Sequence, residues 1–476
     1  MSVDISEYGK NIVNKYAKQL GYDDDKLEML HAIVESITEI LHKHNVFAKS
    51  VEWDREGAKL INNKVQLPSG MEEVITEIIR DNEFYKIFLK EEFGGMGYTP
   101  IVLGPILEVL STFDLSLQIL VTISLSVLEP LISHHKAEFN DVIQKFADGK
   151  TTGYVAFTEA GAGSNLERVK STSMLEGDEW VLNGTKIFIS NGGYADTGLF
   201  LAQNIVGGKP EGTNVFLVEG LKNIEILRLE EKSGLHANPT AQLHFKDVRV
   251  PKENLIGKVG EGYSKVLERL MGMRLGVAYQ ASSMAKRGYQ LAVEYAQTRE
   301  QFGRPIISFP EIKNKIKSME LQIPRLDDYA IRSAFAVERN MRGWIPIEVG
   351  AGGKNMAEKM AAKMLPGVVR YGIAHYFVSS AKLYCTEIAN SMLYDAQQIF
   401  GGMGFVAETE INKIARDARV LSIYEGTSEI HSWAINRAIK AVNMIPKFKY
   451  PYLQYDSETI YEKMLFARFN QLKDII

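Results

Sequence analysis

Apolar residues recur every three or four positions through roughly the first 150 residues, which is the spacing of amphipathic helices. One such stripe consists of Ile33, Ile37, Ile40 and Leu41. We therefore expect residues 1–150 to form a helical N-terminal domain.

The pattern changes between residues 151 and 258, where short alternating or β-branched runs are typical of strands. Asn183-Gly184 and Gly207-Gly208 separate some of these runs, and both are strong signals for tight hairpin turns. Four such runs lie at residues 179–182, 186–189, 214–218 and 242–245. We expect an all-β domain here, a small barrel or sandwich.

Helical spacing returns over residues 259–444, with Arg274, Val277 and Ala281 on one face of a long helix. The glycine-rich block of residues 339–353 predicts a loop between two helices. Residues 445–476 contain Pro446 and Pro451 and predict a C-terminal arm over the surface. The predicted architecture is therefore α+β and multidomain: helical domain, β-domain, helical bundle and arm.

Size and charge narrow the functional classes. A chain of 476 residues exceeds the size at which one hydrophobic core stops growing, so several domains are expected. The formal net charge of -4 argues against a nucleic-acid-binding protein, which normally carries a basic excess. The single cysteine, Cys385, rules out an intrachain disulfide and is expected to be a small core residue.

From the sequence we predict neither a membrane span nor a targeting signal. The most apolar run, from Leu115 to Ile132, is interrupted by Gln118 and by Glu129-Pro130, so we expect a buried helix. The N-terminus is acidic and lacks an apolar signal core and an arginine-rich transit pattern, which favours a cytoplasmic location. The histidine pairs lack the spacing of a zinc site, and no metal centre is predicted.

The strongest candidate for catalysis is Glu425, in the segment Ile423-Tyr424-Glu425-Gly426-Thr427-Ser428. It stands between an aromatic residue and a glycine, outside any run of charges. A carboxylate pushed into an apolar cleft becomes a stronger base because desolvation raises its pKa. The alternative is an ordinary acid at the start of a helix, where it would interact with the helix dipole.

Two glycine-rich segments accompany this carboxylate, at residues 157–165 and 398–405. Glycine lets the backbone approach a ligand closely. Each segment alone is equally compatible with a tight structural loop. With the Glu425 segment, in this order along the chain, they resemble the signature segments of the acyl-CoA dehydrogenases, a family of FAD-dependent enzymes.

The resemblance implies the order of a helical domain, a β-domain and a helical bundle, and it covers residues 154–440 most densely. It also implies which residues bind FAD. Phe157 and Thr158 would lie against the flavin ring, and Phe188 and Ser190 would supply an aromatic face and a hydroxyl. The resemblance further assigns Thr427 and Glu429 to the FAD side of the site.

A second set of FAD contacts is implied for a neighbouring subunit, which would make the protein a homodimer or homotetramer. Arg299 suits the FAD pyrophosphate because a guanidinium presents paired donors to phosphate oxygens. A plain helix end with solvated arginines is the alternative. This set consists of Arg299, Phe302, Gln398, Gly401 and Gly402.

The CoA substrate would meet a third set of residues. Ser164 would bond the pantetheine–phosphate part of CoA, and Tyr424 and Gly426 would line the reacting end. Arg274 would lie at the substrate cleft, although an ion pair with an acid of the bundle explains a buried arginine equally well.

The reaction implied by the resemblance is α,β-dehydrogenation of an acyl-CoA thioester to the 2-enoyl-CoA. Glu425 would remove the α-proton, the flavin would accept the β-hydride, and an electron-transferring flavoprotein would reoxidise it. Three alternatives remain open: an acyl-CoA oxidase, a flavin-dependent monooxygenase, which generally lacks this glutamate, and a non-catalytic flavin- or CoA-binding protein.

Overall fold

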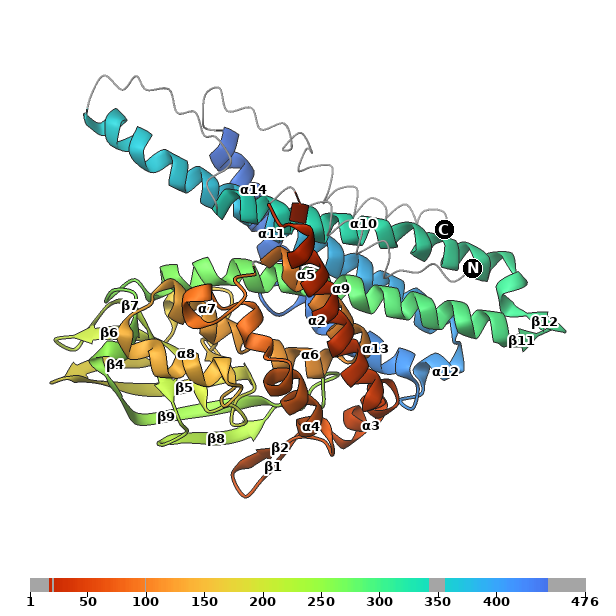
Figure 1. Cartoon of the computed structure of the whole chain (residues 1–476), viewed down its shortest axis with the longest axis horizontal. Helices are drawn as coiled ribbons and strands as arrows, with labels where there is room; N and C mark the ends of the chain where they lie inside the picture. Colours follow the sequence, from red (N-terminus) through yellow and green to blue (C-terminus); the bar gives the residue numbers. More distant parts are fainter. Residues whose placement is uncertain (1–16, 19–20, 99, 342–355, 444–476) are drawn as a thin grey trace.

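The computed structural model describes residues 17–18, 21–98, 100–341 and 356–443. Helices at the N-terminal side and a long helical bundle flank a central sheet (Figure 1). The predicted fold class is therefore confirmed, with one correction to the sheet. The predicted C-terminal arm and most of the predicted loop at 339–353 lie outside the described residues.

The N-terminal region is built mainly from helices, as its apolar spacing predicts. In α2 (Asp24–Lys43) the predicted stripe faces the core, and Asp23 caps the helix by accepting from the Lys26 N–H. One hairpin, β1 (Lys59–Ile61) and β2 (Lys64–Gln66), was not anticipated from the sequence. The other α-helices are α3 (Val46–Glu56), α4 (Met71–Thr76), α5 (Pro100–Phe113), α6 (Leu115–Thr122), α7 (Leu125–Ser133) and α8 (Asn140–Ala147).

One apolar run of the described residues, Leu115–Ser133, is long and apolar enough to cross a membrane, and 72% of it is buried inside the protein. The burial agrees with the sequence prediction of a buried helix, and the helical run has one interruption. The run divides into α6 and α7 at Ser124, whose hydroxyl accepts a hydrogen bond from the Gly153 N–H at 2.8 Å.

The β-domain is one eight-stranded mixed sheet in the order β10-β7-β6-β4-β5-β9-β8, with β3 paired to β6. The edge strands β10 and β8 do not pair with each other in this order, so the sheet does not close, and the predicted barrel is wrong. The strands are β3 (Gly153–Ala156), β4 (Thr172–Glu176), β5 (Glu179–Ser190), β6 (Thr197–Val206), β7 (Lys209–Glu219), β8 (Ile224–Leu229), β9 (Thr240–Pro251) and β10 (Leu255–Ile256).

The predicted hairpin turn at Asn183-Gly184 is also wrong, whereas the turn at Gly207-Gly208 is confirmed between β6 and β7. Asn183-Gly184 lies inside β5, where the register with β9 shifts by a bulge. A Cβ at Gly184 would come within 2.1 Å of the Ser171 hydroxyl, so glycine is needed for a close approach of neighbouring backbone. The β4–β5 turn lies instead at Gly177.

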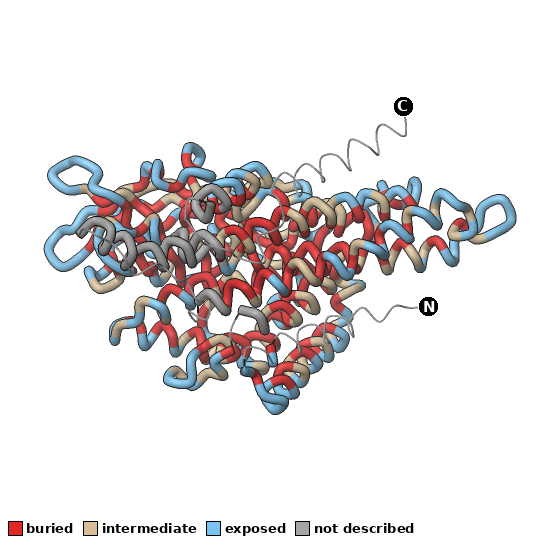
Figure 2. The backbone as a smooth tube through the Cα atoms, turned by 90° about the horizontal axis from the view of Figure 1, so that it is seen from above, coloured by how far each residue is buried: buried red, intermediate tan, exposed pale blue. Residues whose placement is uncertain are grey.

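Three long helices form the body of the bundle: α9 (Gly262–Thr298), α10 (Pro310–Met341) and α11 (Met356–Ile399). They run side by side along the long axis of the molecule, with most buried residues in their middle (Figure 2). Cys385 is buried there, as predicted. Shorter elements follow: α12 (Gly402–Phe405), α13 (Glu410–Ala418) and α14 (Ser428–Asn443). The two-residue strands β11 (Glu300–Gln301) and β12 (Arg304–Pro305) pair as a hairpin between α9 and α10.

Buried ion pairs join the three regions. Lys413 of α13 lies between Asp114, 2.8 Å away at the start of α6, and Asp417, 2.6 Å away. Asp417 also accepts from the backbone N–H of Leu235 in the β-domain. Nearby, Asp54 of α3 contacts both Arg416 and His236. We call these last three residues the Asp54 clamp.

Candidate functional site

Glu425 lies in a tight turn between a 3-10 helix (Arg419–Ser422) and α14. Its backbone is left-handed, with φ 55°, and Gly426 follows with φ 103°. A non-glycine residue in this conformation stores about 1–3 kcal/mol of strain and persists only where its surroundings fix it. We call residues 424–427 the Glu425 turn.

Three buried side chains fix that turn through its carbonyl groups. Arg274 of α9 donates from Nε to the Glu425 carbonyl at 3.1 Å, and His431 of α14 approaches the same oxygen with Nε2 at 3.3 Å. Lys382 of α11 donates to the Gly426 carbonyl at 2.6 Å. A carbonyl only accepts, so His431 must carry its proton on Nε2. The structure thus brings Arg274 to the Glu425 turn, where it bonds the backbone of Glu425.

Burial decides which of these groups carry charge. It lowers the pKa of His431 to about 2 and that of His375, on α11, to about 4, with Arg274 contributing to both shifts. It also lowers the pKa of Lys382 to about 7, although the charges of Glu425, Glu387 and Glu429 oppose the shift. Near neutral pH both histidines are therefore uncharged.

Tyr424 is anchored on the other side of the turn. Its hydroxyl donates to the Gln280 side chain, whose amide donates to Gln118 at 2.5 Å. Burial, followed by the neighbouring Glu425 charge, raises the pKa of Tyr424, so it remains a neutral phenol. At the start of α14 the Thr427 hydroxyl accepts from the Ile430 N–H at 3.5 Å, whereas Glu429 is exposed.

A second group of predicted residues meets in the β-domain. Phe157 and Thr158 follow β3, and Phe188 and Ser190 belong to β5. The Ile187 N–H donates to the Thr158 carbonyl at 2.9 Å, so the loop after β3 lies against the strand that carries Phe188. Phe188 is left-handed, with φ 58°, and 62% exposed, which turns its ring out of the sheet core. The exposed ring and half-buried hydroxyls fit a flat, acceptor-rich cofactor ring. Ser164 is exposed in the following loop.

This loop is held from beneath by a buried pair that the sequence reasoning missed. Lys186 lies 2.8 Å from Glu159 and donates to the Phe157 carbonyl at 3.1 Å. Burial lowers the pKa of Lys186 to about 8. Burial opposes ionisation of Glu159, but Lys186 and the hydrogen bonds from Ser171 and Lys170 hold its pKa below the usual value.

The third predicted group lies at the far end of the bundle, which we call the bundle tip. Arg299 follows the last residue of α9, beside the hairpin that carries Phe302. Gln398 lies at the end of α11, and Gly401 and Gly402 lie at the start of α12 (Figure 1). The rings of Tyr295 and Phe400 stack 4.1 Å apart and join the two sides. Arg299 and Gln398 are exposed, and Phe302 is 91% exposed.

The tip does not meet the Glu425 turn within one chain. Thr298 lies 24 positions beyond Arg274 on the same helix. That separation corresponds to about 36 Å along the axis.

The residues missed by sequence reasoning carry a recognisable signal. Lys382 stands in the segment Ser379-Ser380-Ala381-Lys382-Leu383, a lone cation in small and apolar sequence. Lys186 likewise lies between β-branched and aromatic residues. A single charge inside an apolar run needs a partner when buried, and both lysines find theirs at predicted segments.

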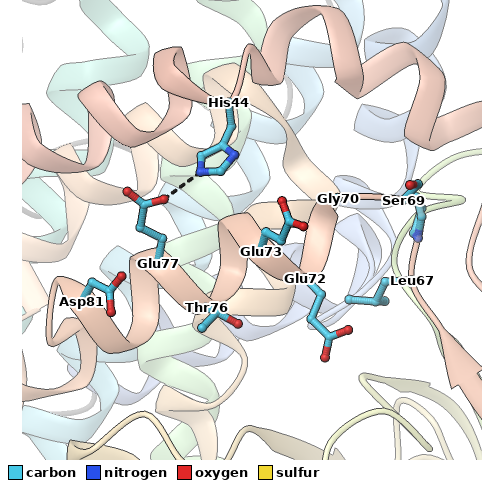
Figure 3. Close-up of a pocket in the computed structure, with 10 residues that line it drawn as sticks. His44, Leu67, Ser69, Gly70, Glu72, Glu73, Thr76, Glu77 and Asp81 are labelled. Atoms are coloured by element: carbon cyan, nitrogen blue, oxygen red, sulfur yellow. Dashed lines mark hydrogen bonds and ion pairs between the residues drawn. The ribbon is translucent and has the colours of Figure 1, made fainter.

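A hollow of about 680 Å³ lies beside α4, with His44, the residue after α2, on its lining (Figure 3). Glu72, Glu73 and Asp81 are among the residues that line it, and Glu77 there pairs with His44 at 2.7 Å. None of the predicted site residues lines this hollow. Among the described residues, no group of three or more His, Cys, Asp or Glu side chains could hold a metal ion.

Comparison with known proteins gives a consistent result. Residues 155–248 match the middle domain of acyl-CoA dehydrogenase, and residues 260–365 and 347–440 match its C-terminal domain.

Two curated relatives are similar along most of their length. The chain is 30% identical to the short-chain-specific acyl-CoA dehydrogenase of Clostridium acetobutylicum, over 73% of this chain and 85% of the relative. It is 32% identical to the mitochondrial short-chain-specific enzyme of Mus musculus, over 72% and 77%.

Two solved structures also resemble the chain. Butyryl-CoA dehydrogenase of Megasphaera elsdenii is 26% identical with a TM-score of 0.69, over 86% of this chain and 98% of that one. A chain from the electron-transferring flavoprotein study of Acidaminococcus fermentans is 28% identical with a TM-score of 0.69, over 88% and 98%. Sequence and fold together therefore place this chain in the acyl-CoA dehydrogenase family.

Proposed function

We propose that the chain oxidises a short-chain acyl-CoA thioester to its 2-enoyl-CoA, with Glu425 as the general base. The observation that carries this proposal is the Glu425 turn: a strained carboxylate-bearing residue is held by buried donors from α9, α11 and α14. Strain maintained in this way is typical of functional sites. The general activity, that of an acyl-CoA dehydrogenase, follows from the family.

FAD, the predicted cofactor, is confirmed by the family. Bound FAD supplies the hydride acceptor. Phe157, Thr158, Phe188 and Ser190 would hold its ring, because the Ile187–Thr158 hydrogen bond aligns an exposed aromatic face with two hydroxyl groups. Lys186 and Glu159 would keep that loop in place.

The protein's own part in the reaction is proton removal. Glu425 would take the α-proton while its backbone N–H helps to polarise the thioester carbonyl. Arg274 and His431 hold the Glu425 carbonyl and thereby keep the peptide planes of the turn in one orientation. Tyr424, locked to Gln280, would exclude water from one side.

The remaining contacts are proposed from the same resemblance. Thr427 and Glu429 would face FAD, and Ser164 and Gly426 would contact the CoA substrate. A short acyl chain is proposed because both curated relatives above are specific for short chains. An electron-transferring flavoprotein would accept the electrons.

We also propose that FAD is shared between two copies of the chain. Thr427 and Glu429 would face FAD beside the turn that Arg274 contacts, and the group around Arg299 lies about 36 Å away along α9, a span that the five-carbon ribityl chain of FAD cannot bridge. If both groups bind FAD, they must bind it from different subunits. A homodimer is then the smallest complete unit, and a homotetramer is a pair of such dimers.

The deciding experiment is anaerobic bleaching of the yellow protein by a panel of CoA thioesters of increasing chain length, with an aryl-substituted member. Rapid bleaching by butyryl-CoA and slower bleaching by longer chains are expected. Failure of every thioester to bleach the flavin would favour a non-catalytic binding protein. Rapid peroxide formation in air without another acceptor would favour an oxidase.

A further inference from the structure

Lys382 is a fully buried ammonium group placed directly on the backbone of the Glu425 turn. Its side chain is 0% exposed, and its Nζ lies 2.6 Å from the Gly426 carbonyl oxygen. An ammonium is costly to bury, so its position needs a compensating interaction. The contact connects the middle of α11 to a turn 44 positions later in the chain.

The charges that face Lys382 come from every element packed around it. Glu425 lies in the turn, Arg274 on α9, Glu387 on α11 and Glu429 on α14. His431 of α14 is neutral because burial lowers its pKa to about 2. Arg274 is a permanent cation beside the turn, and Lys382 joins it when protonated, which is its main form below about pH 7.

The interaction between Lys382 and Glu425 is reciprocal. The Glu425 charge raises the pKa of Lys382 against the larger effect of burial, which lowers it to about 7. By thermodynamic linkage, a proton on Lys382 must favour the ionised form of Glu425 by the same free energy. Ionised Glu425 is the form that can accept a proton.

We propose that Lys382 is a positioning residue for Glu425: its ammonium fixes the Glu425–Gly426 backbone and favours the carboxylate form of the base. This inference rests on the proposed function of Glu425. Arg274 and His431 hold the Glu425 carbonyl, and Lys382 holds the Gly426 carbonyl.

The test compares Lys382→Met and Lys382→Arg with the wild type by measuring kcat/KM against pH. Methionine keeps length and burial but removes both charge and donor. We expect the acidic limb of the Lys382→Met profile to move to higher pH by about one unit, which is a tenfold loss on that limb. Lys382→Arg keeps the charge and should keep the limb near its wild-type position.

Lys232→Met is the matched control. Lys232 also has a pKa lowered by burial and also donates to a backbone carbonyl, that of Asn238 at 3.1 Å. It lies in the β8–β9 connection, and the charges that act on it are those of Asp417 and Glu230 and not that of Glu425. We expect the kcat/KM profile of Lys232→Met to match that of the wild type. A shifted profile in this variant would mean that removing any buried lysine moves the acidic limb.

A readout independent of turnover is the melting temperature as a function of pH. The pKa of Lys382 is about 7 in the folded protein and near 10.5 when unfolded. Between these values the unfolded state binds more protons, so Lys382 makes stability rise with pH. Both Lys382→Met and Lys382→Arg should lose this part of the rise in melting temperature, because methionine has no charge and arginine stays charged. Only Lys382→Arg should keep the acidic limb of the kcat/KM profile at its wild-type position.

The outcomes separate the two proposals. A Lys382→Met enzyme that retains FAD and has an unshifted acidic limb overturns the role of Lys382, while Glu425 stays the base if Glu425→Gln is inactive. An active Glu425→Gln enzyme overturns the base, and the Lys382 proposal falls with it. If Lys382→Met does not fold, Lys382→Gln keeps an amide donor without charge and must show the same shift.

Discussion

At the scale of single residues, the Glu425 backbone is the most constrained feature of the candidate site. Its left-handed conformation is unfavourable for any side chain, yet buried donors hold the Glu425 and Gly426 carbonyls. The side chain is therefore presented by its surroundings and not by local preference. A substitution that keeps the shape of Glu425 should leave the turn intact.

Glu425→Gln is expected to retain FAD and fold but to lose dehydrogenation by at least about a hundredfold, because an amide cannot accept the α-proton. Single-turnover bleaching by butyryl-CoA measures the loss, and flavin absorbance with the melting temperature serves as the control. Near-normal bleaching would show that another group removes the proton.

Site residues that belong to a sequence motif could be predicted from the sequence. Site residues that reach the site only through the packing of distant elements could not. The segment around Glu425 contains a single carboxylate before a glycine, and this pattern alone makes Glu425 a candidate. Nothing local shows that Lys382, 43 positions earlier, reaches the next carbonyl. That contact depends on how α11 packs against the turn, which a one-dimensional pattern does not contain.

At the scale of elements, the bulge in β5 explains why the Asn-Gly signal misled. Asn-Gly favours a tight turn when the chain is free to reverse. Here Asn183 exchanges hydrogen bonds with Asp247 on β9, and Gly184 leaves room for Ser171. Strand pairing therefore overrides the local preference. Helix periodicity was more reliable, since α2 and α9 bury the faces that their spacing predicts.

Gly184→Ala should destabilise the protein by about 3 kcal/mol, because the new Cβ would overlap Ser171, including its backbone. Ser171 also donates to Glu159, so FAD should dissociate more readily. Chemical denaturation and flavin release measure the two effects.

Gly208→Ala is the control, at a turn where φ is 78° and no atom lies within 4 Å of the new Cβ. It should cost about 1 kcal/mol from the left-handed backbone alone. Equal losses in both variants would contradict the steric explanation.

At the scale of the whole molecule, the Asp54 clamp joins the N-terminal helices, the β-domain and the bundle, and its strength depends on pH. Contact with Asp54 raises the pKa of His236, so its stabilisation is complete below the unfolded pKa and is lost as pH rises through the raised value. Hydrogen bonds from His236 and Arg416 hold the pKa of Asp54 well below its usual range against the effect of burial, so it stays ionised at mildly acidic pH.

The difference in melting temperature between wild type and His236→Gln should accordingly be largest near pH 5 and shrink toward pH 8. Thermal unfolding in buffers of equal ionic strength measures it. His244→Gln, a partly buried histidine on β9 bonded to a threonine hydroxyl, is the matched control. A difference that grows with pH would contradict the clamp.

Arg299→Glu should weaken FAD retention and dimerisation together, because it places an acid beside the proposed pyrophosphate site. Light scattering and flavin absorbance on the same samples measure both. A wild type that is monomeric with full flavin would show that the shared site is wrong.

The length of α9 implies that two inactive variants can restore activity when they are expressed together. If each FAD lies between the tip of one chain and the β-domain of another, two different inactive chains can repair each other. In a dimer of Glu425→Gln with Arg299→Glu, one site receives both lesions and the other receives neither. If all pairings were equally stable, about a quarter of the sites would carry neither lesion, and weaker pairing of Arg299→Glu with itself would raise that share. Co-expression of the two inactive variants would then give measurable dehydrogenase activity, whereas either variant expressed alone would not.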